Sequence, residues 1–286
     1  MVTLDGDVVA RYPRVSRYNS PYPAHDAGCA VDLYPDDGWD ADGHARAAPS
    51  PVAGEVVETR TVSCPDRPYA AAHDHLVVVD TGEYLARILH VDPAVEPGDA
   101  VAVGDSLGDM VRSGFFAPWV DNHLHLGFRE HGQNAVRASG SLPLDLDVPV
   151  EPAVWDGRAT VVETGETWLR LDEPTHPAPG EAYAGLASDD GALLDGGLPH
   201  YEAGYAAGTG ETVSLFGAVV GDRTGDRTVA WRDGVTVTVD GEPAKGLSLW
   251  LGRDELGCKV VCPGHGFAVG DAVTVAVTPA DGGGRE

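Results

Sequence analysis

The chain has 286 residues, enough for one large domain or two ordinary ones. Acidic residues outnumber basic ones 45 to 19, which gives a formal net charge of -26, and lysine occurs only at Lys245 and Lys259. Such a surface repels nucleic acid and anionic membranes, so the composition argues against both as partners. It is typical of proteins that work at high salt, where added ions screen the repulsion.

The N-terminal segment "MVTLDGDVVARYPR" carries acidic residues where a signal peptide is basic. No apolar run of about 18 residues, the length that predicts a membrane-spanning helix, occurs in the chain. Four cysteines are few for a disulfide scaffold and agree with a reducing compartment. We therefore expect a cytoplasmic protein that does not cross a membrane.

Residues 1–139 predict a domain of short strands. The 37 glycines and 21 prolines of the chain interrupt it densely, and no stretch keeps a helical period over three turns. The runs between them are rich in Val, Leu, Thr and aromatic residues: "AGEVVETRTV", "HLVVVDTGEYLARILHV", "DAVAVGDSLGDM" and "HLHLGF". The sequence therefore predicts an all-β fold for this part.

Residues 140–154, "GSLPLDLDVPVEPAV", predict an extended linker, because prolines punctuate them. Residues 155–286 bring new strand signals, such as "ETVSLFGAVVG" and "AVTVAVTP", and four of the six tryptophans. They predict a second β domain, a barrel or a sandwich, with an accessory role. Within it, "WRDGVTVTVDGEP" predicts a hairpin through its Asp-Gly pairs.

Two histidines one residue apart stand out in "DNHLHLGFR", residues 121–129. On a strand, side chains at i and i+2 leave the same face, so His123 and His125 are expected to point the same way. A single His-x-His is weak, however, because such motifs are often structural. The chain contains a second copy at His73 and His75, which we interpret as a turn that enters a strand.

Further polar residues complete a possible site. His25 and Asp32 in "HDAGCAVD" are seven apart, a spacing that puts them on opposite faces of a straight strand. Gly28 between them permits a turn or bulge that brings both side chains to one point. His90 closes the strand-like "YLARILH". A catalytic zinc site needs such convergent ligands and a position left open for water.

Residues 15–135 resemble the lysostaphin-type zinc peptidases. The likeness rests on four segments in the same order: "SPYPAHDAGCAVD", "APSPVAGEVV", "EYLARILHVDPAVEPGDAVAVGDSLGDM" and "NHLHLGFR". The first motif departs from that family, which usually has His and Asp four apart. Its His-x-x-Gly-x-Ala-x-Asp pattern looks like the first motif of D-alanyl-D-alanine carboxypeptidases, which share a His, Asp, His zinc site.

The resemblance implies an open, antiparallel, barrel-sandwich β domain for residues 1–139 and a role for each polar residue. His25, Asp32 and His125 would bind Zn²⁺, His123 would be the general base, and His90 would stabilise the developing oxyanion. The implied activity is that of a peptidase or amidase that cleaves a peptide bond with metal-activated water. Its expected substrate is a peptide or a peptidoglycan-like chain.

Two other functions fit parts of the sequence. The same fold without activity would be a module that binds a peptide or a glycan. A barrel with a lipoyl or biotinyl arm is suggested by "VEPGDAVAVGDSLG", but that function needs a lysine at a hairpin tip, and residues 1–150 contain none.

Three residues near the C-terminus, Cys258, Cys262 and His265, raise the question of a structural zinc site. Their spacing is unusual for one, and a fourth ligand is missing unless His176 or His200 supplies it. We favour two buried thiols that act as small apolar groups. Asn19 and Tyr22, just before His25, are either residues that line the site or ordinary turn residues.

Overall fold

The computed structural model describes residues 1–18, 23–36 and 44–279 of the chain. Asn19 and Tyr22 lie outside these residues. The chain divides into two compact units, which are described separately. Unit 1 consists of Met1–Val15 and Pro23–Val148, and unit 2 consists of Ser16–Tyr22 and Pro149–Glu286. The secondary structure is almost entirely β, which confirms the predicted fold class.

Unit 1 contains two short helices and twelve assigned strands among the described residues. Their bounds are α1 (Gly6–Val9), α2 (Pro23–Asp26), β1 (Val2–Leu4), β3 (Ala30–Tyr34), β4 (Ala47–Pro49), β5 (Gly54–Val62), β6 (Asp74–Asp80), β7 (Leu85–Leu89), β8 (Val91–Pro93), β9 (Ala100–Val101), β10 (Ser106–Met110), β11 (Leu124–Arg129) and β12 (Leu144–Leu146), with β2 (Arg14–Ser16) at the boundary between the units.

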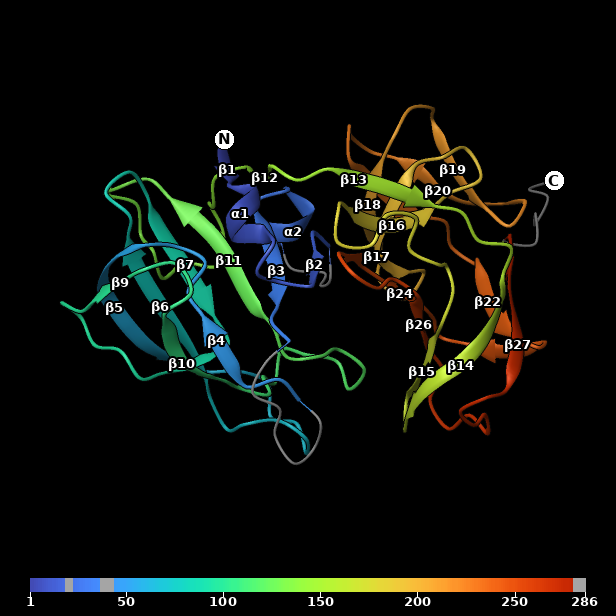
Figure 1. Cartoon of the computed structure of the whole chain (residues 1–286), viewed down its shortest axis with the longest axis horizontal. Helices are drawn as coiled ribbons and strands as arrows, with labels where there is room; N and C mark the ends of the chain where they lie inside the picture. Colours follow the sequence, from blue (N-terminus) through green and yellow to red (C-terminus); the bar gives the residue numbers. More distant parts are fainter. Residues whose placement is uncertain (19–22, 37–43, 280–286) are drawn as a thin grey trace. The chain divides into compact units, whose positions relative to one another are not determined.

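The main sheet of unit 1 is antiparallel in the order β9-β5-β6-β7-β11-β3 (Figure 1). Its strands are rich in Val, Leu and Ile, and the run Leu76–Val79 on β6 is almost completely buried. Four consecutive buried residues mean that both faces of the sheet are covered at β6. Three further strands form a small antiparallel sheet in the order β4-β10-β8. This is the open antiparallel architecture that was expected.

The segment 140–154, predicted as a linker, contains two short strands that pair with other parts of the chain. Strand β12 runs parallel to β1, and β13 (Val150–Ala153) runs parallel to β16 (Tyr183–Ala187). A proline-punctuated sequence predicts the extended backbone, but it gives no information on these pairings. They join residues more than 30 positions apart, and only the folded chain brings such residues together.

Unit 2 contains the remaining strands. Their bounds, in addition to β13 and β16, are β14 (Arg158–Gly165), β15 (Trp168–Leu171), β17 (Leu193–Leu198), β18 (Ala203–Ala207), β19 (Thr212–Leu215), β20 (Ala218–Arg223), β21 (Thr228–Trp231), β22 (Thr236–Val239), β23 (Glu242–Ala244), β24 (Gly246–Leu249), β25 (Leu251–Gly252), β26 (Cys258–Val261) and β27 (Ala272–Thr278).

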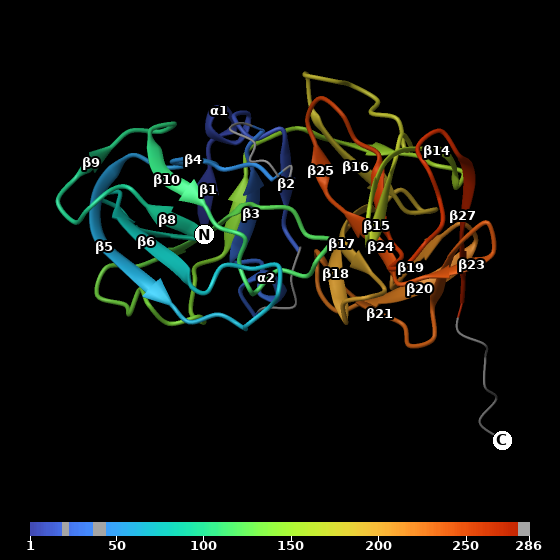
Figure 2. The same ribbon diagram turned by 90° about the horizontal axis from the view of Figure 1, so that it is seen from below.

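The strands of unit 2 pair in an open series. From one end it runs β19-β20-β21-β18-β17 (Figure 2), and from β17 it continues β24-β26-β15-β14-β27-β22-β23. Within the residues that the structure describes, these pairings do not close into a barrel. Side chains from most of these strands meet in one apolar core, so unit 2 is a folded body of its own.

Two local predictions for unit 2 are confirmed. Asp240 and Gly241 have φ angles of 50° and 86° and connect β22 to β23, which is the hairpin turn that an Asp-Gly pair favours. Cys258 and Cys262 are free, buried thiols within the apolar core. Burial raises the pKa of Cys262 to about 11 and that of Cys258 still further, so neither forms a thiolate at neutral pH.

No helix in the described part of the chain is long and apolar enough to cross a membrane. The helices α1 and α2 have four residues each.

Candidate metal centre

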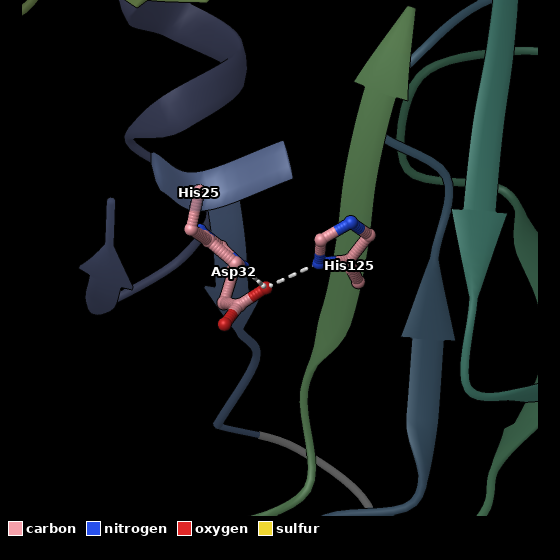
Figure 3. Close-up of side chains that lie close together, drawn as sticks. All are labelled: His25, Asp32 and His125. Carbon is pink, nitrogen blue, oxygen red and sulfur yellow. Dashed lines mark hydrogen bonds and ion pairs between the residues drawn. The ribbon is translucent and has the colours of Figure 1, made fainter. Parts of the chain in front are cut away.

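The candidate site is built around the carboxylate of Asp32. Strands β3 and β11 are antiparallel neighbours, and their register places His125 directly opposite Asp32. His125 Nδ1 lies 2.9 Å from Asp32 Oδ1, and His25 Nε2 lies 3.2 Å from the same oxygen. Figure 3 shows the three side chains, which come from α2, β3 and β11. They are the residues that the sequence suggested as metal ligands.

A turn at Gly28 brings His25 to this position. His25 lies on the short helix α2, and the chain then turns into β3 through Gly28, whose φ is +65°. The turn is held by hydrogen bonds from Gly28 N to His25 O and from Cys29 N to Ala24 O. A left-handed backbone angle is cheap only for glycine. The predicted turn at Gly28 is therefore confirmed, and it solves the problem of the odd spacing.

His123 points to the same carboxylate from the residue just before β11. Its Nε2 lies 3.5 Å from Asp32 Oδ2, and its Nδ1 lies 2.9 Å from the carbonyl oxygen of Asp121. A carbonyl can only accept a hydrogen bond, so Nδ1 carries the proton and Nε2 presents a lone pair. His123 and His125 thus point the same way, as the alternation predicts, and each approaches a different oxygen of Asp32.

His90 lies next to this group and is held by a carboxylate of its own. It follows β7 with a φ of 73°, an uncommon angle for a residue other than glycine. Its ring centroid is 5.2 Å from that of His123, and its Nδ1 lies 2.6 Å from Asp74 Oδ2. Asp74 Oδ2 also accepts from Ser113 Oγ, 2.7 Å away. Two hydrogen bonds on one oxygen orient the Asp74 side chain and, through it, His90.

The site is nearly closed to solvent. The side chains of His25 and Asp32 are 0% and 1% exposed, whereas His125 is 13% exposed. Burial lowers the pKa of His123 to about 3 and that of His125 to about 4, because it penalises the charged imidazole more than Asp32 favours it. Burial would raise the pKa of Asp32, but His25, His123 and His125 together hold it well below its usual range. At neutral pH, His123 and His125 are therefore neutral and Asp32 is ionised.

These protonation states fit a metal ion. A metal needs deprotonated ligands, and neutral imidazoles with a carboxylate provide them. Asp32 Oδ2 is buried and has no hydrogen-bond partner among the described residues, and no Lys or Arg in this part of the chain forms an ion pair with Asp32. A buried carboxylate without a cation is costly. A metal held by His25, Asp32 and His125, whose ligand atoms all lie within 4.8 Å of one another, would compensate that charge.

The second His-x-His, His73 and His75, is not part of the group of described residues that could hold a metal. His73 is exposed, and His75 is partly exposed with its Nε2 3.8 Å from Asp92. The residue between them, Asp74, is the buried partner of His90. Asp74 was not predicted as a site residue from the sequence. Strand alternation contained the signal, since a polar residue between two outward-facing side chains must face inward.

The C-terminal candidates do not converge on a metal. His265 Nε2 lies 2.9 Å from Gly165 O and its Nδ1 accepts from Phe267 N, so both ring nitrogens contact backbone groups. His176 is bound in the same way by Gly252 O and Ala178 N. Among the described residues, the group of His25, Asp32 and His125 is the one whose geometry suits a metal. The interpretation of the two cysteines as apolar core residues agrees with this.

Fold and site together define an all-β protein of two units, with a buried His/Asp/His group in the first that could hold a metal ion. The chain belongs to the family described as domain of unknown function DUF8155. The N-terminal domain of that family matches residues 3–146, and its C-terminal domain matches residues 151–278. No curated protein matches the chain. Because the family description assigns no activity, the function is argued from the site.

Proposed function

We propose that the protein is a zinc-dependent peptidase or amidase. The observation that carries the proposal is the convergence of His25, Asp32 and His125 on one point, with His123 and His90 beside them. Two imidazoles and one carboxylate are a ligand set of catalytic zinc sites, which keep one position open. A zinc ion bound there would polarise a carbonyl group and make water a stronger nucleophile.

The protein's own residues supply the acid-base chemistry in this proposal. His123, neutral with its Nε2 lone pair directed toward Asp32, is suited to accept a proton beside the metal position. The hydrogen bond between His90 Nδ1 and Asp74 orients the ring, and in this proposal His90 donates to the developing oxyanion from its other ring nitrogen. Peptides rich in glycine or other small residues, including peptidoglycan-like cross-bridges, are the proposed substrate class.

A second function is favoured by the burial of the site. His25, Asp32 and His123 are each at most 4% exposed, and a site so well covered suits a metal that stabilises the fold. In this alternative the protein is a module that binds a peptide or glycan without cleaving it.

Metal analysis and a cleavage assay on the same preparation separate the two functions. The peptidase proposal predicts about one zinc per chain and hydrolysis of at least one peptide in a library of small-residue sequences, abolished by a chelator and restored by zinc. Zinc binding with no cleavage of any peptide would support the binding module. A wild-type protein that holds no zinc after incubation with it would contradict both.

A further inference from the structure

Two buried arginines in unit 1 lack a carboxylate partner. Arg87 on β7 and Arg129 on β11 are 3% and 1% exposed. The register of the two strands puts Arg87 opposite Gly127, two residues from Arg129, so both side chains start from the same face. Neither arginine forms an ion pair with an Asp or Glu among the described residues. A buried charge without a partner costs several kcal/mol, so this arrangement favours the binding of a counterion.

The guanidinium of Arg129 is only partly satisfied. Its Nη2 donates to Arg137 O at 2.7 Å, but Nε and Nη1 are buried and have no hydrogen-bond partner in the described structure. Arg87 donates through Nε to the carbonyl of Ala135. Ser141 Oγ, on the segment that leads from β11 to β12, is also buried without a partner. A Cβ atom built on Gly127, the residue opposite Arg87, would lie 3.1 Å from Ser141 Oγ, so this hydroxyl lies on the same face of the sheet as the two arginines. Nε and Nη1 of Arg129 and Oγ of Ser141 can each donate a hydrogen bond.

Among the described residues, no acidic side chain forms an ion pair with this cluster. The thiol of Cys29 interacts electrostatically with Arg129, but burial raises the pKa of Cys29, so the thiol is neutral at pH 7. Burial lowers the pKa of Arg129, and the nearby charge of Arg137 lowers it further. Three arginines thus raise the local potential in a chain whose net charge is -26.

The 137–141 segment lies against the guanidinium of Arg129. A Cβ atom built on Gly140 would lie 3.1 Å from Arg129 Nη1, which is a tight contact, so the missing side chain lets the backbone approach the guanidinium closely. Ala138, Ser139, Gly140 and Ser141 in this segment are all small, which leaves little bulk beside the unused donors.

We propose that Arg129, Arg87 and Ser141 form a binding site for a small anion of halide or carboxylate size, distinct from the metal centre. Arg129 lies four residues along β11 from His125, which corresponds to about 13 Å. The anion accepts hydrogen bonds from the unused donors and neutralises the buried charge. It therefore fastens the 137–141 segment onto the sheet.

Thermal unfolding at constant sodium concentration and constant ionic strength tests the proposal. Chloride is exchanged stepwise for gluconate, a bulky anion, with formate as a carboxylate probe and phosphate as a larger one. A site predicts a saturable rise of the melting temperature with chloride or formate, as expected for a ligand that binds only the folded state. Phosphate alone should give no such rise.

Variants connect the effect to the cluster. Arg129→Gln should weaken the apparent anion affinity about tenfold or more, since a hydrogen bond between charged partners is lost. Ser141→Ala, a milder change on a half-buried residue, should weaken it several-fold and covers the case in which Arg129→Gln does not fold. Arg158→Gln is the matched control, because it removes the same charge from an exposed arginine whose side chain is 81% accessible. Its response to anions should equal that of the wild type.

Anomalous scattering from crystals grown in bromide locates the anion directly. A peak between Arg129 and Ser141 is expected. No anion-specific stabilisation and no bromide peak would overturn the proposal, since water would then satisfy the donors. Equal responses of the wild type, Arg129→Gln and Ser141→Ala would place the anion elsewhere and overturn it too.

Discussion

His123 and His125 approach different oxygens of the Asp32 carboxylate. The two histidines can therefore be given different roles, general base for His123 and metal ligand for His125. In the proposed zinc site, His125→Ala leaves only two protein ligands, and zinc affinity should fall by more than the 10- to 100-fold that is typical for changes in residues around the ligands. His123→Ala should keep nearly one zinc per chain, while hydrolysis falls by about 10²- to 10⁴-fold, the usual contribution of a positioned acid or base.

Metal content measured on both variants decides between these roles. His73→Ala and His75→Ala, from the second His-x-His, are the controls and should leave zinc content unchanged. If both His123→Ala and His125→Ala keep full zinc, the assignment of His125 as a ligand is wrong. Loss of zinc in the His123 variant alone would reverse the two roles.

Asp74 links the site to the pH dependence of stability. The hydrogen bonds and charge of His90, with Ser113 and the His75 amide, outweigh burial and lower the pKa of Asp74 to about 2. Because the pKa is lower in the folded state, the carboxylate stabilises the protein above its unfolded pKa of about 3.9 and loses this effect as the pH falls through about 2.

We therefore expect the stability difference between the wild type and Asp74→Asn to shrink by about 2 kcal/mol from pH 5 to pH 2. Urea unfolding at several pH values measures it. The control is Asp233→Asn, an exposed position, where the difference should stay nearly constant. A constant difference for Asp74→Asn would mean that its carboxylate has no special stabilising role.

Among the secondary-structure elements, the turn between α2 and β3 determines whether His25 reaches Asp32 and His125 in the candidate metal centre. Gly28 has a φ of +65° and no atom lies within 4 Å of a Cβ built there, so Gly28→Ala introduces backbone strain without a clash. The strain costs about 1–2 kcal/mol. Relief of this strain would shift His25, so zinc affinity should fall as well as stability.

Gly132→Ala is the matched control for this change. Gly132 has a φ of +83°, an equally open Cβ position, and lies in the loop after β11. Its substitution should lower the free energy of unfolding by a similar amount and leave zinc binding as in the wild type. Calorimetric zinc titration of both variants checks this. Equal zinc affinities would show that the Gly28 turn does not position His25.

For the whole molecule, the net charge of -26 predicts a dependence on salt. Repulsion among the acidic side chains destabilises the compact state at low ionic strength, and added salt screens it over about 10 Å at 0.1 M. The melting temperature should rise by roughly 5 °C or more between dilute buffer and molar KCl. Scanning calorimetry measures it, and a melting temperature that stays constant would rule out the adaptation to salt.

Several features of the protein could be predicted from local sequence alone. Val- and Leu-rich runs between glycines and prolines predicted an all-β chain, Asp240-Gly241 predicted a hairpin, and Gly28 predicted the turn that lets His25 and Asp32 meet. Each depends on the conformational preferences of a few neighbouring residues, which act over a short distance along the chain. The order of the histidine and aspartate motifs also indicated the group of His25, Asp32 and His125 that could hold a metal.

Only the tertiary structure decided the rest. The pairing of His90 with Asp74, the register that sets His125 opposite Asp32, and the burial of Arg87 and Arg129 on neighbouring strands all bring together residues that are far apart in the chain. Ser16–Tyr22 belongs to unit 2, where buried Asp195 accepts hydrogen bonds from Ser16 and Arg17. Such contacts depend on which strands become neighbours and which charges are buried together. The packing of the whole core determines which strands become neighbours, so this cannot be read from a short stretch of sequence.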